Sequence, residues 1–236
     1  MHAGNATTLS IVMPVYNEQP TIEKIIQSVL AAPVDLPMEV IAVDDRSTDG
    51  TRDVLAVLAA RQGRLRVVLQ DRHQGKGAAI REAIAYVTGD IVIIQDADLE
   101  YDPREYPALL QPILEDRADV VVGDRFHGGA HRVLYYSHYL GNRLLTTLCN
   151  LVSGLNLRDM EAGYKVFRTS VLKQLHLRAR GFDIEPELVI KAARLGVRIY
   201  EVPIAFHART YREGKKASWW DGIIAIWRIA VAGLVD

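Results

Sequence analysis

The segment from Asp90 to Glu100 constrains the fold more than any other part of the chain. Its positions 91–94 are four consecutive apolar residues, three isoleucines and one valine. A short apolar run rich in β-branched residues is typical of a strand buried on both faces, as in a parallel sheet with helices above and below. The segment therefore predicts an α/β fold.

Strand-like and helical patterns alternate along the chain. The expected strands cover residues 9–15, 39–43, 65–69, 90–95, 119–123, 166–167 and 197–202. The expected helices cover residues 22–30, 51–60, 78–87, 104–116, 133–157 and 186–195. This alternation indicates a Rossmann-like, mostly parallel sheet with right-handed crossovers and helices on both faces.

The first five expected strands each end or continue in a polar loop. These loops contain residues 16–18, 44–46, 75–77, 96–100 and 124–125. Ligands of such sheets bind beyond the carboxyl ends of the strands, so we expect the loops to surround one cleft. Their carboxylates, lysine and arginines suit an anionic ligand bound with a metal ion, such as a nucleotide diphosphate.

Asp96 and Asp98 follow the Asp90 strand directly and are separated by one residue. In an extended chain both side chains can point the same way and bind one divalent cation, or one can bind the cation and the other a sugar hydroxyl. The alternative is a pair of turn or helix-capping aspartates. Capping explains Asp102, which precedes Pro103 at an expected helix start, but leaves the other two unexplained.

Composition favours one domain of 236 residues with a large core. We expect a nucleotide-sugar-binding half (9–126), an acceptor half (127–218) and an apolar helix (219–236). The net charge of −1 argues against a nucleic-acid binder. The single cysteine, Cys149, excludes an internal disulfide and suits the core. A single cysteine leaves the redox compartment open and favours the cytosol, and no secretory signal and no apolar run of about 18 residues is found.

Two later segments are apolar enough to meet a membrane surface. Residues 133–157 and 219–235 combine apolar residues with tyrosine, tryptophan and arginine, which suits an interfacial helix. A core helix and an oligomer helix are the respective alternatives. Between them, the segment 207–216 concentrates four basic residues, Arg209, Arg212, Lys215 and Lys216. It is either a solvated loop or a lid over a diphosphate.

Residues 10–18, 43–50, 75–77, 96–98 and 123–125, taken in order, resemble the family 2 glycosyltransferases, which have the GT-A fold. Residues 159–165, 182–187 and 213–216 resemble the polyprenyl-phosphate sugar synthases, the group that includes dolichyl-phosphate mannose synthase. The resemblance covers nearly the whole chain and includes the Asp-Ala-Asp motif at 96–98.

The resemblance implies a role for each matching residue. The donor nucleotide would be bound by Pro14, Tyr16, Glu18, Asp44, Lys76, Asp96 and Ala97. Asp98 and Glu100 would hold Mg²⁺ or Mn²⁺ and the diphosphate, although relatives often have glutamine at position 100. Arg125 and Arg132 fall where relatives bind the acceptor phosphate, so that Asp98, Arg125 and Arg132 are the expected catalytic residues.

The chemistry of such a transfer fits these residues. A departing nucleotide diphosphate gains negative charge, which a divalent cation and the lid cations would stabilise. An acceptor phosphate, with a second pKa of about 6, is mostly dianionic at pH 7 and attacks without a protein base. A hydroxyl acceptor would need a base, for which Asp159 and Glu161 are the candidates. Their alternative role is helix capping or a salt bridge to the acceptor arginines, Arg125 and Arg132.

The sequence therefore favours an inverting, metal-dependent transferase that moves a hexose from UDP-hexose or GDP-mannose to a polyprenyl phosphate. It would be peripheral on the cytoplasmic face of the membrane and bind no nucleic acid, with homo-oligomer formation left open. The first alternative is a transferase of the same fold that uses a soluble saccharide or protein hydroxyl. The second is a nucleotide-binding protein without catalysis, in which damage to the Asp96 and Asp98 pair would be expected.

Overall fold

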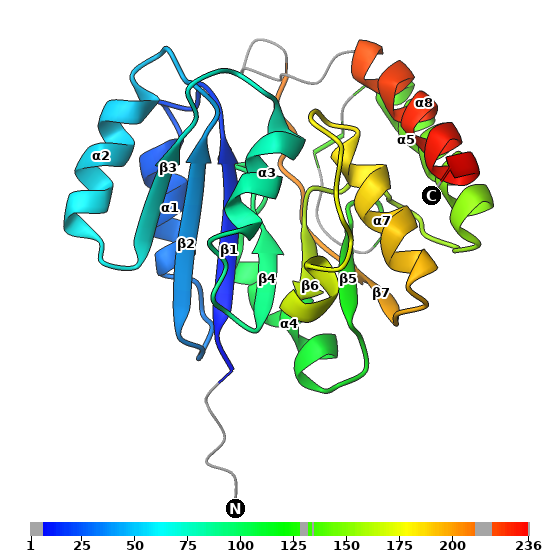
Figure 1. Ribbon diagram of the computed structural model, residues 1–236, viewed down its shortest axis with the longest axis horizontal. Helices are drawn as coiled ribbons and strands as arrows, with labels where there is room; N and C mark the ends of the chain where they lie inside the picture. The colour runs from blue at the N-terminus through cyan, green and yellow to red at the C-terminus, as the bar shows by residue number, and fades with distance from the viewer. Residues whose placement is uncertain (1–6, 128–131, 134, 211–218, 236) are drawn as a thin grey trace, which may run out of the picture.

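A seven-stranded sheet forms the centre of the computed structural model, which describes residues 7–127, 132–133, 135–210 and 219–235. Helices cover both faces of this sheet (Figure 1). The strands are β1 (Leu9–Val15), β2 (Met38–Asp44), β3 (Leu65–Leu69), β4 (Ile91–Ile94), β5 (Val120–Asp124), β6 (Lys165–Arg168) and β7 (Ile199–Pro203). Their order across the sheet is β3-β2-β1-β4-β6-β5-β7.

Strand β6 is the antiparallel member of an otherwise parallel sheet. It pairs with β4 on one side and with β5 on the other, and Lys165 at its start lies opposite Ile94 at the end of β4. The carboxyl ends of the six parallel strands therefore share an edge with the loop that precedes β6. This arrangement brings residues 159–164 of the second half beside Asp96 of the first.

Two layers of helices enclose the sheet. One face is covered by α1 (Ile22–Leu30), α2 (Thr51–Arg61) and α4 (Tyr106–Leu114), the last preceded by the 3-10 helix η1 (Pro103–Glu105). The other face carries α3 (Lys76–Ile84), α5 (Tyr136–Ser153), α6 (Thr169–Leu172), α7 (Ile184–Arg194) and α8 (Trp219–Val235). Helix α8 packs on α5 and α7 at the periphery (Figure 1).

The sequence of β4 explains its central place. Ile91 and Ile93 pack into the core on the α1 and α4 side, whereas Val92 and Ile94 pack into the core on the α3 and α7 side. All four are at most 1% exposed, and burying such a side chain contributes roughly 1.5 to 3 kcal/mol. A strand that is apolar at every position is stable only where both faces are covered.

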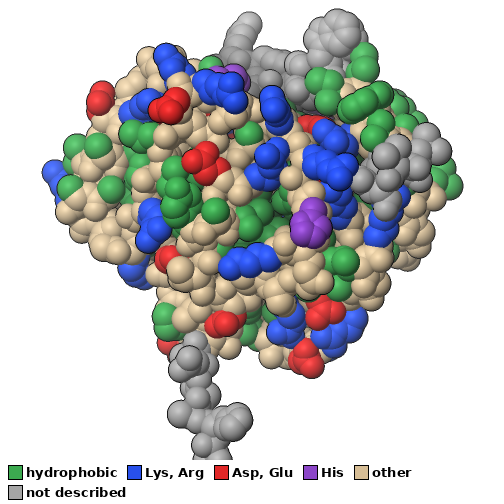
Figure 2. Space-filling model, viewed as in Figure 1, with side chains coloured by type: hydrophobic (Ala, Val, Ile, Leu, Met, Phe, Trp, Pro, Cys, Tyr) green, Lys and Arg blue, Asp and Glu red, His purple; other side chains and the backbone are tan. Residues whose placement is uncertain are grey.

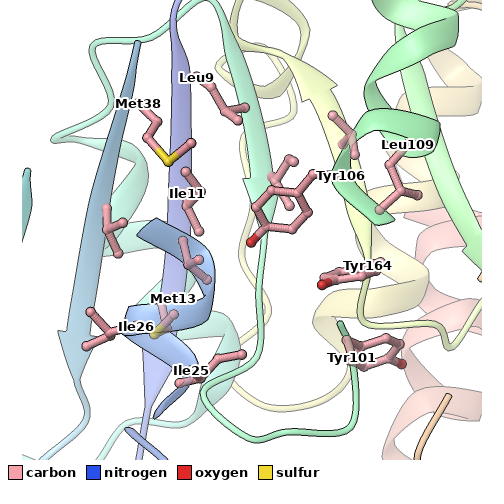
Figure 3. Packing of buried hydrophobic residues seen from close by; sticks show 14 of the residues in the cluster. Leu9, Ile11, Met13, Ile25, Ile26, Met38, Tyr101, Tyr106, Leu109 and Tyr164 are labelled. Atoms are coloured by element: carbon pink, nitrogen blue, oxygen red, sulfur yellow. The ribbon is translucent and has the colours of Figure 1, made fainter. Parts of the chain in front are cut away.

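Three buried tyrosines pack together in the core next to the carboxyl ends of the strands. The ring of Tyr164 lies 4.7 Å from that of Tyr101 and 5.9 Å from that of Tyr106, measured between centroids (Figure 3). The buried side chain of Gln95 accepts a hydrogen bond of 2.8 Å from each of the hydroxyls of Tyr106 and Tyr164. Its own amide donates to the carbonyl of Asp96 at 3.0 Å, which fixes the backbone where β4 ends.

The predicted α/β fold with a mostly parallel sheet is confirmed, and the differences concern element ends and the short helix α6, which was not predicted. Asp102 accepts a hydrogen bond from the Arg104 backbone as expected, but the first turn is a 3-10 helix and α4 starts at Tyr106. The helix predicted over 133–157 is shorter, because Gly154 adopts a left-handed conformation with φ of 73° and ends α5. Among the described helices, none has the length and apolar character needed to cross a bilayer.

Candidate active site

Arg209 gathers three carboxylates beyond the end of β4. Its Nη2 lies 2.5 Å from Oδ2 of Asp98, its Nη1 lies 3.2 Å from Oε1 of Glu18, and its Nε lies 3.4 Å from Oε1 of Glu100. The Arg209 backbone also donates to Glu100 at 2.7 Å. One guanidinium thus faces three acidic side chains, from the β1 loop and the β4 loop.

This cluster carries more negative charge than Arg209 can neutralise. Burial, together with the nearby Asp96 and Glu100, raises the pKa of Asp98 to about 7, although Arg209 acts in the opposite direction. Carboxylate oxygens are the ligands that Mg²⁺ and Mn²⁺ prefer, so the donor set fits such an ion. Among the described residues, no group of three or more acidic, histidine or cysteine side chains is arranged to hold a metal ion by itself. Mg²⁺ commonly takes one or two carboxylates and completes its shell with water and substrate phosphate.

Asp96 is held from a different direction than Asp98. Its Oδ1 lies 2.7 Å from Nζ of Lys76, which also lies 2.9 Å from Oε1 of Glu185. Burial alone would lower the pKa of Lys76, but Asp96 and Glu185 raise it above its ordinary value. A Cβ at Gly163 would come within 2.4 Å of Asp96 Oδ2, so a glycine is needed for this close approach.

The chain of charges continues into the core. The other oxygen of Glu185 pairs with Nζ of Lys165, which is fully buried and donates to the carbonyls of Met160 and Ala162 at 3.0 and 2.5 Å. Lys165 and Glu185 were missed by sequence reasoning. The available signal was a lysine placed directly before the strand-like residues 166–167.

The expected nucleoside residues line the ends of β1 and β2. The Oδ1 atom of Asp44 accepts from the Ser47 backbone at 3.0 Å and from Nε of Arg52 at 2.5 Å. Its Oδ2 atom is buried and has no hydrogen-bond partner among the described residues. Pro14 is the next-to-last residue of β1 and lies opposite Val43 in β2. An orphaned carboxylate oxygen at this edge is suited to accept from a ligand N–H or O–H.

An aromatic pair lies in the same region. The ring of Tyr16 packs on that of His73 with centroids 4.2 Å apart, and His73 Nδ1 lies 2.9 Å from Asp45 Oδ2. His73 was not predicted as a site residue. Glu18 is fixed by Thr21, whose hydroxyl lies 2.7 Å from Glu18 Oε2 and 3.1 Å from the carbonyl of Ala97.

Arg125, at the end of β5, forms a buried ion pair with Asp159. Its Nε and Nη2 lie 2.6 and 2.7 Å from the two carboxylate oxygens, and Asn142 donates to the same carboxylate at 3.1 Å. The guanidinium also lies 5.4 Å from the ring of Phe126 and 5.0 Å from that of Phe206. Burial would lower the pKa of Arg125, but Asp159 raises it well above the ordinary value.

Arg132 and Arg125 both contact the segment 206–208. The backbone of Arg132 donates to the carbonyl of Phe206 at 3.0 Å, and its exposed side chain donates to that of Ala208 at 3.2 Å. Residues 206–209 therefore connect the two expected acceptor arginines with the carboxylates around Arg209. The other three expected lid residues, Arg212, Lys215 and Lys216, lie outside the described residues.

The two candidate bases differ. Asp159 is fully buried and bound to Arg125 and Asn142, so neither of its oxygens is available to a substrate. Glu161 has a buried Oε1 without a hydrogen-bond partner in the part of the chain that the structure describes. Burial, followed by the repulsion from Glu185, raises the pKa of Glu161 to about 7.

Known proteins resemble the chain over most of its length. The model of glycosyl transferase family 2 matches residues 10–176. The low-salt glycan biosynthesis hexosyltransferase Agl6 of Haloferax volcanii is 33% identical over 86% of this chain and 49% of its own length. The dodecaprenyl-phosphate galacturonate synthase of Rhizobium johnstonii is 28% identical over 88% and 61%, respectively. The undecaprenyl-phosphate 4-deoxy-4-formamido-L-arabinose transferase of Edwardsiella ictaluri is 32% identical over 88% and 62%. The chain thus spans about half to three fifths of these relatives.

Solved structures agree with this result. Glucosyl-3-phosphoglycerate synthase from Mycobacterium tuberculosis, crystallised with Mn²⁺, UDP and glucosyl-3-phosphoglycerate, superposes with a TM-score of 0.73 at 25% identity. The match covers 96% of this chain and 78% of that one. The predicted GT-A fold and the predicted family resemblance are both confirmed. The chain therefore belongs to glycosyl transferase family 2.

Proposed function

We propose that the chain is an inverting, metal-dependent glycosyltransferase that moves a hexose from a nucleotide-diphosphate sugar to a polyprenyl phosphate. The observation that carries this proposal is the closed pair of Arg125 and Asp159. It leaves an arginine at the carboxyl edge and removes one of two candidate bases. An anionic acceptor needs an arginine to bind it and needs no protein base to deprotonate it.

The donor half would bind UDP-hexose or GDP-mannose. Tyr16 and His73 offer an aromatic surface for the base, and the orphaned oxygen of Asp44 offers an acceptor for the nucleoside. Asp98 and Glu100 would hold Mg²⁺ or Mn²⁺, which when bound neutralises charge on the diphosphate. Support comes from the Mycobacterium tuberculosis synthase, which was crystallised with UDP and either Mn²⁺ or Mg²⁺.

The acceptor half would orient a phosphate. A phosphate oxygen attacks the anomeric carbon while the bond from that carbon to the diphosphate oxygen breaks on the opposite side, so that configuration inverts. Nη1 of Arg125 and the exposed side chain of Arg132 would donate to the attacking group, and no proton is removed from it. The names of the Rhizobium and Edwardsiella relatives, which specify dodecaprenyl and undecaprenyl phosphate, support this acceptor class.

A hydroxyl acceptor is the second candidate, favoured by Glu161. A carboxyl with a pKa of about 7 and an orphaned buried oxygen has the properties of a general base. The two candidates therefore differ in whether the charge of Glu161 is required. They agree on the donor, the metal and the fold.

Two conservative variants separate these candidates. With a phosphate acceptor, Arg125→Lys should slow transfer by about 30-fold or more, because lysine cannot reproduce the fixed fork of the guanidinium, and Glu161→Gln should retain most of the rate. With a hydroxyl acceptor, Glu161→Gln should cost at least about 100-fold. The measurement is the initial rate at saturating donor, with circular dichroism as the folding control. An inactive Glu161→Gln beside a near-normal Arg125→Lys would refute the phosphate acceptor.

We also propose that the protein is peripheral on the cytoplasmic face of the membrane. A lipid-linked acceptor requires contact with a membrane surface, and the cytoplasmic face is where nucleotide sugars would be available to it. The apolar segments within 133–157 and 219–235 are the proposed contact with the membrane.

A further inference from the structure

A hollow of about 380 Å³ lies between α8 and the loop that precedes α7. Its walls are Arg178, Arg180, Phe182 and Asp183 of the loop, with Ile224, Trp227 and Arg228 of α8. Neither the arginines nor the α8 residues belong to the donor or acceptor site described above. The hollow combines charged side chains at its rim with an apolar wall, so both kinds of contact are available to a ligand.

The lining of the hollow has more basic than acidic side chains. Its walls carry three arginines and one aspartate, and the aspartate is already paired with Arg228, whose Nε and Nη2 lie 2.8 and 2.7 Å from Oδ2 of Asp183. Arg178 and Arg180 are both exposed at the rim. In Figure 2, basic side chains gather on this part of the molecule beside the apolar side chains of the helices at the upper right. The complementary ligand is an anion.

The apolar wall continues onto a larger apolar surface. Trp227 is 60% exposed and Ile224 47% exposed, although both border the hollow. Further exposed side chains on α8 and on α5, which packs against it, are Ile223, Ile226, Leu140, Leu144 and Leu151. A soluble phosphate ion would gain nothing from this apolar surface. A molecule with an anionic head and apolar chains would contact both parts.

We propose that this hollow binds the headgroup phosphate of an anionic phospholipid while the exposed apolar side chains of α5 and α8 contact the acyl region of the same bilayer. The proposal rests on the proposed function, because it specifies the membrane contact of that enzyme. The proposed function names only apolar helices as the membrane contact. This inference specifies the class of lipid bound and the residues that bind its headgroup.

The loop that forms the hollow also contacts the donor site. The backbones of Gly77 and Ala78, at the start of α3, donate to the carbonyls of Gly181 and Arg180 at 3.2 and 3.0 Å. The ring of Phe182 lies 5.9 Å from Nζ of Lys76. A bilayer bound at this loop would therefore lie near the cleft, where a lipid-linked acceptor could reach it.

The test is co-flotation of the full chain with phosphatidylcholine vesicles, with and without phosphatidylglycerol. The double variant Arg178→Glu with Arg180→Glu reverses the rim charge. A matched double variant, Arg61→Glu with Arg64→Glu, reverses two exposed arginines near the end of α2, on the opposite side of the sheet from α8 (Figure 1). We expect phosphatidylglycerol to increase vesicle binding of the wild type, the rim variant to reduce this binding at least about ten-fold, and the matched variant to have little effect.

Four results would overturn the proposal. The first is equal binding to both kinds of vesicle, and the second is an equal loss in the two double variants. The third is displacement by inorganic phosphate at the same phosphate concentration, which would indicate a site for the free ion. The fourth is a Trp227→Ala variant that dissociates a dimer in sedimentation but leaves vesicle binding unchanged, which would indicate that the face binds a second copy instead.

Failure here can be distinguished from failure of the proposed function. Vesicle binding is measured without donor or acceptor, so it does not depend on transfer. In detergent, the rim variant should transfer sugar to a short polyprenyl phosphate at the wild-type rate, and its melting temperature should match that of the wild type. Vesicle binding by a wild type that transfers nothing would refute the proposed function alone.

Discussion

Arg209 and Arg125 are similarly buried at the same edge of the sheet, with 18% and 15% of their side chains exposed, but their charges are balanced differently. Arg209 lies within ion-pair distance of Asp98, Glu18 and Glu100, whereas Arg125 forms its ion pair with one fully buried carboxylate, that of Asp159, and has Glu161 nearby. The donor side therefore has negative charge to spare and the acceptor side does not. In the proposed function, a divalent cation would be held beside Arg209, and Arg125 would be fixed by Asp159 while its Nη1 donates to the acceptor phosphate.

Removing charge from the donor side should have the largest effect on transfer. Asp98→Asn deletes one proposed metal ligand, and losing several kcal/mol of charge stabilisation corresponds to about a 1000-fold slower rate. The unfolding temperature should not fall, because the variant reduces repulsion among the carboxylates. Initial rates with Mn²⁺ and with Mg²⁺ check this, and metal-dependent turnover at the wild-type rate would disprove the role of Asp98.

Breaking the acceptor pair should mainly affect stability. Asp159→Asn leaves the Arg125 guanidinium buried without its counter-ion, which typically costs about 3 to 5 kcal/mol. For a chain of this size each kcal/mol lowers the melting temperature by roughly 2 to 4 °C. Thermal unfolding of this variant beside Arg125→Lys measures the effect. An Asp159→Asn protein with the melting temperature of the wild type would show that Asp159 does not stabilise the charge of Arg125.

The pH dependence of Glu161 is expected to be smaller. Its pKa is raised from 4.5 to about 7 in the folded protein, so the folded state holds this proton more tightly than the unfolded state. The resulting stability is fully present below pH 4.5 and is lost as the pH rises to about 7, by about 1 to 3 kcal/mol in total. Glu161→Gln should therefore gain stability relative to the wild type across this range. Denaturant melts at pH 5 and pH 8 give the comparison, and an unchanged difference would show that Glu161 titrates normally.

Arg209→Ala should have the smallest of these effects. It should strengthen Mn²⁺ binding but slow sugar transfer. Without the guanidinium, Asp98 and Glu100 should bind Mn²⁺ in the absence of nucleotide about ten-fold more tightly, a change of roughly 1.4 kcal/mol. Transfer should still become slower, because a cation near the diphosphate is lost. Calorimetric titration with Mn²⁺ tests the first part. Weaker Mn²⁺ binding in this variant would place the metal elsewhere.

The sequence predicts the donor side better than the acceptor side for a physical reason. A buried strand and the carboxylates that follow it belong to one continuous segment, so β4 and Asp98 could be predicted from local pattern. On the acceptor side, the sequence offered a salt bridge from Asp159 or Glu161 to an arginine as one alternative, and the structure forms it between Asp159 and Arg125. The choice of partner could not be predicted, because the two residues are 34 positions apart and meet only where antiparallel β6 brings its preceding loop to the same edge. Lys165 and Glu185 are likewise joined only by the tertiary fold.

The most direct test of the division between a metal-binding donor side and a phosphate-binding acceptor side is product analysis with the wild-type protein. Each of a panel of UDP- and GDP-sugars is incubated with a polyprenyl phosphate or with the matching polyprenol, in the presence of Mn²⁺ or of EDTA. We expect a glycosylated lipid phosphate from one donor with Mn²⁺, and none with the polyprenol or with EDTA. Transfer to the alcohol, or transfer that continues in EDTA, would contradict the proposed function.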